Sequence, residues 1–398
     1  MTTIKLDPGA ALLLDALHGA GHAAYAVGGC VRDSLLGLDP HDWDLCTSAR
    51  PEQVMALLGE EKCIPTGLQH GTVTVKQGGK LYETTTFRTE GAYSDGRHPD
   101  AVCFVPDVRE DLARRDFTIN AMAYSAEEGL IDPFGGQDDL AAHLVRAVGE
   151  PERRFEEDAL RMFRALRFSA RLGFEIESGT LEAIGKKAHL ASALAAERVR
   201  DEVEKILLTP SPETVFTLID LGLMDTYLLR RLSRAEPLAR LRLLPKKSLC
   251  RWAGLCLVLL SEGAVRSAED FLLKLRLDSR TLRCCAEAAV ILQSPLPSTT
   301  VAWKRLLHRS GVDTVTCAAA CGDALYGGSR AKELKAVLKS GECFSMKHLA
   351  VSGDDLLALG LRGKELGEML NFLLDYVMEY PRNNRRELLL SLAKGTEE

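Results

Sequence analysis

Apolar and polar residues alternate along residues 67–88, whereas from residue 151 onward apolar residues recur with a helical period. Alternation is typical of strands, and a period of about 3.6 residues is typical of helices. The pattern predicts strands at residues 23–27, 42–47, 67–75 and 80–88, and helices at residues 8–21, 31–36 and 51–58. We therefore expect an α/β head, a small mixed sheet with helices, followed by an all-α neck, body and tail.

The 398 residues exceed what one hydrophobic core usually holds. Changes of pattern predict four parts, with boundaries at residues 1–140, 141–210, 211–295 and 296–398. Hydrophobic residues make up 46% and charged residues 27%, as in soluble globular proteins. The N-terminus does not read as a signal peptide, and the longest apolar run is too short to span a bilayer. These features predict a cytoplasmic protein without a membrane partner.

Cysteine is abundant, with eleven residues, but the number is odd and no Cys-x-x-Cys occurs. Cys284 and Cys285 are neighbours that pair poorly with each other. We expect reduced, mostly buried thiols in a reducing compartment, and no zinc site.

Positive charge gathers locally although the net charge is −6. Residues 230–251 hold eight basic residues against one acid, Glu236. Such a segment is suited to follow a phosphate backbone. The alternative is a set of helix faces that arginine side chains keep solvated.

The candidate chemistry begins at a Gly-Gly turn, Gly28 and Gly29, and at two aspartates, Asp42 and Asp44. Alternate residues on an extended chain share a face, so both carboxylates point to one spot and suit Mg²⁺ shared with phosphates. The glycines allow backbone N–H groups to close on a phosphate, and Arg32 follows within reach. Taken singly, Gly-Gly is a common turn and Asp-x-Asp is commonly a solvated loop.

Together, Gly-Gly-Cys-Val-Arg-Asp and the Asp-x-Asp segment resemble the polymerase-β-like nucleotidyltransferases, in particular the branch of tRNA nucleotidyltransferases and bacterial poly(A) polymerases. The resemblance implies a CCA-adding enzyme of the bacterial class II type. Such an enzyme transfers CMP, CMP and AMP from CTP and ATP to the 3′ end of tRNA without a template and releases pyrophosphate. It implies Mg²⁺ at Asp42 and Asp44.

Glu83 is a candidate third carboxylate beside this pair, because a Glu-x-Thr-x-x-Arg stretch runs close to the active site in the family. An ordinary exposed strand glutamate is the alternative. The polar, glycine-containing segment at residues 90–103 predicts a mobile loop. In the family a flexible loop here helps the site switch from cytosine to adenine, with Arg97 as its candidate working residue.

Residues 111–124 resemble the second motif of the family. Arg115 suits a phosphate, and Asp116 suits the 2′-hydroxyl that distinguishes ribonucleotides. An Arg-Asp pair that caps a surface helix is the alternative.

A third candidate group lies in the predicted neck, where Asp158, Arg161, Arg164, Arg167 and Arg171 would share one helix face. The stretch resembles the Glu-Asp-x-x-Arg motif of class II CCA-adding enzymes. Cytosine and adenine both present an amine donor beside a ring-nitrogen acceptor, so a carboxylate and a guanidinium select them against uracil and guanine. A mismatch leaves buried polar groups unpaired and can discriminate by about 10⁴.

The resemblance thus implies that Asp158 and Arg161 select the base and that Arg164 and Arg167 hold the triphosphate or buttress that pair. The alternative for the segment is a solvated helix laced with Glu and Arg pairs. For the whole chain, an A-adding enzyme, a poly(A) polymerase or an inactive RNA-binding module are the rival functions. A metal-dependent phosphohydrolase would need a His-Asp pair. The sole such pair, His41-Asp42, is already explained by the metal-binding segment.

Overall fold

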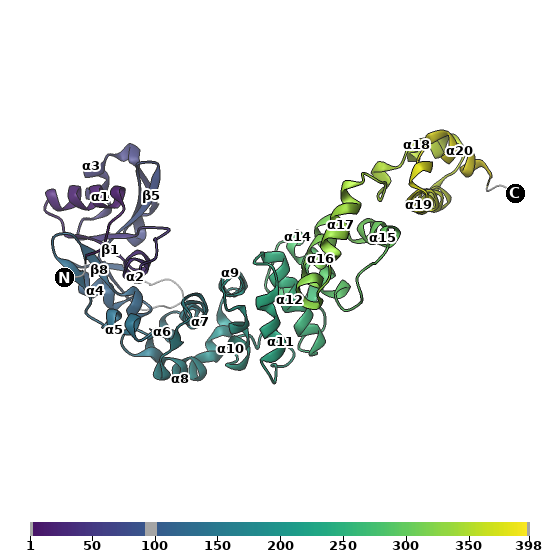
Figure 1. Cartoon of the computed structure of the whole chain (residues 1–398). Coiled ribbons are helices and arrows are strands. Elements are labelled where there is room, and N and C mark those ends of the chain that lie inside the picture. Colours follow the sequence, from purple (N-terminus) through teal and green to yellow (C-terminus); the bar gives the residue numbers. More distant parts are fainter. Residues whose placement is uncertain (1–2, 92–101, 396–398) are drawn as a thin grey trace. The chain divides into compact units, whose positions relative to one another are not determined.

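The computed structural model describes residues 3–91 and 102–395. The chain forms two compact units, Met1–Thr226 and Tyr227–Glu398. In the first unit a mixed sheet is followed by helices, and every regular element among the described residues of the second unit is a helix (Figure 1). The predicted α/β head and helical remainder are confirmed. None of the helices in the described part of the chain is long and apolar enough to cross a membrane.

The head contains a seven-stranded sheet with the order β3-β4-β5-β2-β1-β8-β9. Its strands are β1 (Ala24–Val27), β2 (Leu45–Thr47), β3 (Cys63–Gly67), β4 (Thr72–Gln77), β5 (Lys80–Thr86), β8 (Ala123–Ser125) and β9 (Gly129–Ile131). β2 and β5 are parallel, and the other neighbouring pairs are antiparallel. The sheet is mixed, as predicted; of the parallel pair, β5 carries Glu83, and the Asp-x-Asp segment directly precedes β2.

Helices and a cluster of buried hydrophobic side chains pack against the sheet of the head. Its helices are α1 (Pro8–Gly19), α2 (Gly29–Leu35), α3 (Pro51–Leu58), α4 (Val108–Ala113) and α5 (Gly136–Ala141). Tyr25 and Val27, two residues apart on β1, pack in one cluster with Val108 and Leu112 of α4. Alternation along β1 thus turns one face toward α4. A hairpin of β6 (Arg88–Glu90) and β7 (Val102–Phe104) flanks the segment predicted as a loop.

The neck consists mainly of α6 (Pro151–Glu157), α7 (Leu160–Leu172), α8 (Ser178–Lys187) and α9 (Ala196–Leu207), with α10 (Val215–Asp220) after them. α7 packs against α9, and α6 packs against α8. The neck also contains two strands, β10 (Leu144–Val145) and β11 (Glu175–Ile176), which form a short parallel pair. The prediction of an all-α neck misses that pair.

The second unit contains α11 (Glu236–Ala239), α12 (Ser248–Ser261), α13 (Ala268–Lys274), α14 (Ser279–Ile291), α15 (Thr300–Ser310), α16 (Val312–Tyr326), α17 (Arg330–Lys339), α18 (Gly353–Ala358), α19 (Gly363–Glu379) and α20 (Arg386–Lys394). α12, α14 and α16 pack against one another (Figure 1). A separate cluster around Leu356, Leu373 and Leu389 joins the last three helices.

Two predicted elements have different limits in the structure. β2 begins at Leu45, so Asp42 and Asp44 lie in the segment directly before the strand. The helix predicted to include Asp158 begins only after it, because α6 ends at Glu157 and Asp158 has an extended backbone with φ −147°. The Asp158 carboxylate accepts the N–H of Leu160 at 3.0 Å, which favours a new helix start over a continuous helix.

Candidate active site

Asp42 and Asp44 are the two exposed members of an alternating segment. Trp43 and Leu45 are 7% and 1% exposed, whereas both aspartates are exposed. The backbone carbonyl of Asp44 accepts the N–H of Val27 at 2.9 Å, which ties this segment to the end of β1. The predicted alternation is therefore present, although it precedes the strand. Oδ1 of Asp42 lies 3.1 Å from Nδ1 of His41.

Negative charge converges on Asp44. Desolvation of its carboxyl, together with the charges of Glu83 and Asp42, raises the pKa of Asp44, and the positive charge of Arg115 opposes that rise. Glu83 is an exposed residue of β5, next in sequence to Thr84, which pairs with Leu45 across the parallel ladder. The register thus places Glu83 beside the Asp-x-Asp segment.

Arg115 lies directly over the Gly-Gly turn. Gly28 adopts φ +79°, and a Cβ built on it would lie 2.9 Å from Nη1 of Arg115. Gly28 caps the N-terminus of α2, so the arginine, the turn and the positive end of the helix dipole meet at one place. Nη2 of Arg115 lies 3.4 Å from Asp111, and its buried Nε has no hydrogen-bond partner. This geometry suits an oxyanion such as a phosphate.

Arg32 is placed differently from the sequence interpretation. It is 2% exposed, and its guanidinium donates to Oδ1 of Asp33 at 2.8 Å and to Oδ1 of Asn120 at 2.6 Å. Burial lowers the pKa of Arg32, and the charge of Asp33 opposes that effect. Arg32 therefore braces α2 against the segment that precedes β8, and its side chain is already engaged.

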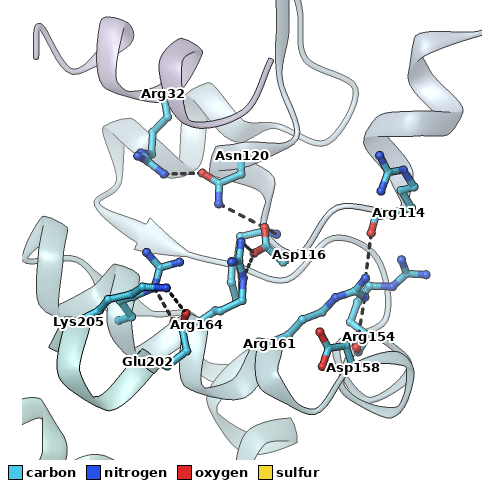
Figure 2. A network of polar contacts seen from close by, with 12 residues as sticks. Arg32, Arg114, Asp116, Asn120, Arg154, Asp158, Arg161, Arg164, Glu202 and Lys205 are labelled. Carbon is cyan, nitrogen blue, oxygen red and sulfur yellow. Dashed lines mark hydrogen bonds and ion pairs between the residues drawn. The ribbon is translucent and has the colours of Figure 1, made fainter. Parts of the chain in front are cut away.

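Asp116 binds protein groups of the head and the neck. Its Oδ2 accepts from Nε of Arg164 at 2.7 Å and its Oδ1 from Nδ2 of Asn120 at 3.2 Å, and Figure 2 shows the chain of contacts from Arg32 through Asn120 and Asp116 to Arg164. Burial alone would raise the pKa of Asp116, but the charge and hydrogen bonds of Arg164 lower it to about 2. The carboxylate therefore stays ionised and joins the head to α7.

The predicted base-selecting pair lies where α6 meets α7. Oδ2 of Asp158 accepts from Nη2 of Arg198, on α9, at 2.9 Å. Arg161 donates to Oε2 of Glu157 at 2.7 Å. It also donates to the backbone carbonyl oxygens of Arg154 and Arg114, each at 3.2 Å (Figure 2). The two side chains are thus oriented by separate partners instead of by one helix face.

Arg164 and Arg167 surround Phe168. The guanidinium carbons of Arg164 and Arg167 lie 5.6 and 4.2 Å from its ring centre, and that of Arg32 lies at 5.2 Å. These separations are within cation–π range. Nε of Arg167 donates to Oε2 of Glu202 at 2.6 Å, and Glu202 also pairs with Lys205. Burial lowers the pKa of Arg167, against the charge of Glu202.

Four residues of this network escaped the sequence interpretation: Asn120, Phe168, Arg198 and Glu202. Arg198 lies on α9 and holds Asp158. Asn120 lies inside the second motif and Phe168 inside the Glu-Asp-x-x-Arg stretch, so their positions within the motifs were the available signal. Arg97 and most of the predicted loop at residues 90–103 lie outside the described residues.

Comparisons with known families agree with this arrangement. Residues 24–146 match the family described as the poly A polymerase head domain, and residues 173–233 match the probable RNA- and SrmB-binding site of polymerase A. The sheet, the Gly-Gly turn and the acidic segment therefore define a nucleotidyltransferase of the poly A polymerase head class.

Full-length relatives narrow the class. The chain is 36% identical over 390 residues to the CCA-adding enzyme of Limosilactobacillus fermentum, covering 96% of this chain and 95% of that protein. It is 38% identical over 394 residues to that of Lactiplantibacillus plantarum, with coverages of 96% and 94%. The crystal structure of the Bacillus stearothermophilus CCA-adding enzyme in complex with CTP superposes with a TM-score of 0.84 at 32% identity and covers 98% of both chains. The chain belongs to the CCA-adding enzymes, a family of tRNA nucleotidyltransferases.

Proposed function

We propose that this chain adds C, C and A in turn to the 3′ end of tRNA, using CTP and ATP and releasing pyrophosphate. The observation that carries the proposal is the convergence of Asp44, Glu83 and Arg115 at the turn of Gly28. Acidic groups and an anion-binding guanidinium near one turn support a single site for a metal ion and a triphosphate. An in-line attack of the tRNA 3′-hydroxyl on the α-phosphate requires both kinds of group.

The donor set fits Mg²⁺. Asp42, Asp44 and Glu83 offer hard carboxylate oxygens, and both aspartates are open to solvent. Asp42 and Asp44 would hold the ion, with Glu83 beside them. Bound Mg²⁺ supplies a lowered pKa for the attacking hydroxyl and neutralises charge on the leaving pyrophosphate.

The remaining roles follow from the contacts. Arg115, with the backbone of Gly28 and Gly29, holds phosphate oxygens at the N-terminus of α2. Arg164 and Arg167 hold the triphosphate from α7, with Asp116 positioning Arg164 and Glu202 positioning Arg167. Arg32 supports Asp116 through Asn120. Asp116 then acts on the nucleotide through Arg164, in addition to the ribose contact predicted from its motif.

Asp158 and Arg161 select the base in this proposal. Oxygens of Asp158 accept from Leu160 and Arg198, and a carboxylate has about four acceptor positions, which leaves room for an exocyclic amine. The contacts of Arg161 use three of the five guanidinium N–H groups. These protein partners also fix the orientation of the Asp158 carboxylate and the Arg161 guanidinium. Fixed orientation favours selection of the base by the geometry of its hydrogen bonds.

We retain the four-part division into residues 1–140, 141–210, 211–295 and 296–398 as part of the proposal, with tRNA bound by the tail and by the basic segment of the body. The basic segment at residues 230–251 supports tRNA binding, since its residues Arg240, Arg242 and Lys246 are exposed. All eleven cysteines are free, which supports a cytoplasmic location.

Replacement of one carboxylate tests the catalytic assignment. Asp44→Asn should abolish CMP and AMP incorporation while tRNA binding, measured by filter retention, stays within about twofold of wild type, since charge at the metal is lost without change of shape. Asp15→Asn, on α1, is the matched control and should keep wild-type incorporation. Full incorporation by the Asp44→Asn protein would contradict the proposal.

A further inference from the structure

A cluster of thiols lies in the second unit, apart from the elements that form the nucleotidyltransferase site. Cys250 is on α12, and Cys317 and Cys321 are one turn apart on α16. Their three Sγ atoms all lie within 4.8 Å of one another, and in the described residues this is the one group of three potential metal ligands so close together. Cys284, on α14, interacts with Cys317 from outside this group of three and is the candidate for a fourth ligand.

The cluster is fully enclosed by packed helices. Cys250, Cys284, Cys317 and Cys321 are 3%, 3%, 5% and 0% exposed. α12, α14 and α16 pack pairwise, so the thiols come from three elements that the fold holds together (Figure 1). A buried site without a solvent-facing position is typical of structural metal ions and not of catalytic ones.

The spacing of the three clustered sulfurs suits the edges of a tetrahedral site. The Sγ atoms of Cys250 and Cys317 are 3.9 Å apart. A tetrahedron with Zn–S bonds of about 2.3 Å has sulfur–sulfur edges of about 3.8 Å. A disulfide needs about 2.05 Å, and all of these cysteines are free. In the alternative the four thiols are small apolar core residues, and S–H hydrogen bonds from Cys317 to Sγ of Cys250 and from Cys321 to the carbonyl oxygen of Cys250 hold them together.

Sequence spacing concealed the group. The cysteines do not form a Cys-x-x-Cys pair, and for that reason the sequence predicted no zinc. The i, i+4 spacing of Cys317 and Cys321 places two ligands on one helix face, and the others come from different helices. The positive charges of Lys247 and Arg251 act on Cys250 and would offset the charge of metal-bound thiolates.

We propose that Cys250, Cys284, Cys317 and Cys321 bind one thiophilic d¹⁰ metal ion, Zn²⁺, as a structural site that joins α12, α14 and α16. Each thiol would give up its proton to the solvent on binding, and no redox change takes place. The site does not depend on the proposed transferase function, because its ligands lie in a different unit.

Metal analysis of the full chain tests the proposal. Protein purified without chelators should contain about one zinc ion per chain by mass spectrometry. The double variant Cys317→Ala/Cys321→Ala should lose it, whereas Cys256→Ala, a buried cysteine of α12 outside the cluster, should retain it. Zinc that stays in the double variant would overturn the proposal.

A spectroscopic measurement on the wild-type protein covers the case in which the double variant fails to fold. Protein produced with Co²⁺ should show the intense ligand-field and thiolate charge-transfer bands of a tetrahedral cobalt–thiolate site. Wild-type protein that contains no zinc and shows no such bands with Co²⁺ would overturn the proposal, and the cysteines would then be core residues only.

Discussion

At the scale of single residues, Asp116 receives contacts from both the head and the neck. Its carboxylate accepts from Arg164 of α7 and from Asn120, which in turn accepts from Arg32 of α2. The sequence placed Arg32, Asp116 and Arg164 near one another through their motifs. It did not reveal that Asn120 links Arg32 to Asp116, because Arg32 and Asn120 are 88 positions apart.

Asp116→Asn should destabilise the protein in a pH-dependent way. The folded-state pKa of about 2 lies below the ordinary 3.8, so the ionised carboxylate stabilises the fold above about pH 4, and this stabilisation disappears as the pH falls toward 2. The difference corresponds to about 2 kcal/mol at neutral pH. Urea unfolding at pH 7 should show this loss in the variant, and at pH 3 the gap to wild type should narrow.

The exposed Asp201 provides the control for that experiment, since Asp201→Asn removes a surface pair with Arg200 and should change stability by less than about 0.5 kcal/mol. A gap between Asp116→Asn and wild type that stays constant from pH 7 to pH 3 would contradict the role of Asp116.

Glu83→Gln should raise the Mg²⁺ concentration needed for half-maximal activity and lower kcat about tenfold or more, because it removes one negative charge beside Asp44. A titration of incorporation against Mg²⁺ measures both effects. Glu60→Gln, exposed in the same head, should leave the curve unchanged. An unaltered Mg²⁺ curve for Glu83→Gln would reduce Glu83 to an ordinary strand residue.

At the scale of elements, α7 presents its arginines to several neighbours at once. Arg164 binds Asp116 of the head, Arg167 binds Glu202 of α9, and Arg171 binds Asp33 of α2 at 3.1 Å. The three-residue spacing predicted correctly that these arginines share a face. The prediction that Asp158 lies on the same helix was wrong. The Asp158 side chain accepts a nearby backbone N–H, which competes with a continuous helix, and the spacing of residues does not reveal this hydrogen bond.

The head shows the same limits of prediction. The Gly-Gly turn, α3 and the hairpin of β4 and β5 follow from local signals, namely glycine pairs, a proline at the helix start and alternation. The parallel pairing of β2 with β5 brings Glu83 beside Asp44, and it joins segments that are far apart in sequence. Such pairing follows from the whole sheet and not from either strand.

Glu202→Gln tests the bond between α7 and α9. Glu202 is 3% exposed, so loss of its charge leaves Arg167 buried without a compensating carboxylate, and the free energy of unfolding should fall by about 3 kcal/mol. KM for CTP and for ATP should rise together because Arg167 loses its position. Glu204→Gln on the same helix is the control, and equal effects of the two changes would contradict the assignment.

At the scale of the whole molecule, the chain combines a head with recognisable motifs and a helical second unit that carries few of them. The exposed arginines and lysines at residues 230–251 are the clearest sign of an RNA surface there. Not all of them are available, since Arg251 is 4% exposed and Arg230 donates to the backbone of Gly263 at 3.3 Å. The charge count alone overestimated the exposed basic surface.

Arg240→Ala/Lys246→Ala should weaken tRNA binding and reduce its dependence on salt. Each phosphate contact that is lost should lower the slope of log affinity against log salt by about one. Filter binding over a range of salt concentrations measures the slope. Lys62→Ala/Lys76→Ala, in the head, removes the same charge, and an equal loss of slope there would contradict a specific role for the segment.

The most direct test of the account supplies one labelled nucleotide at a time, with Mg²⁺, to tRNA that ends before CCA and to tRNA that ends in CC. The account predicts that CTP extends the first substrate by two residues, that ATP extends the second by one, and that UTP and GTP are not used. ATP use on the CC-ended tRNA alone would indicate an A-adding enzyme, and long A tails would indicate a poly(A) polymerase. The absence of any incorporation would contradict the catalytic account.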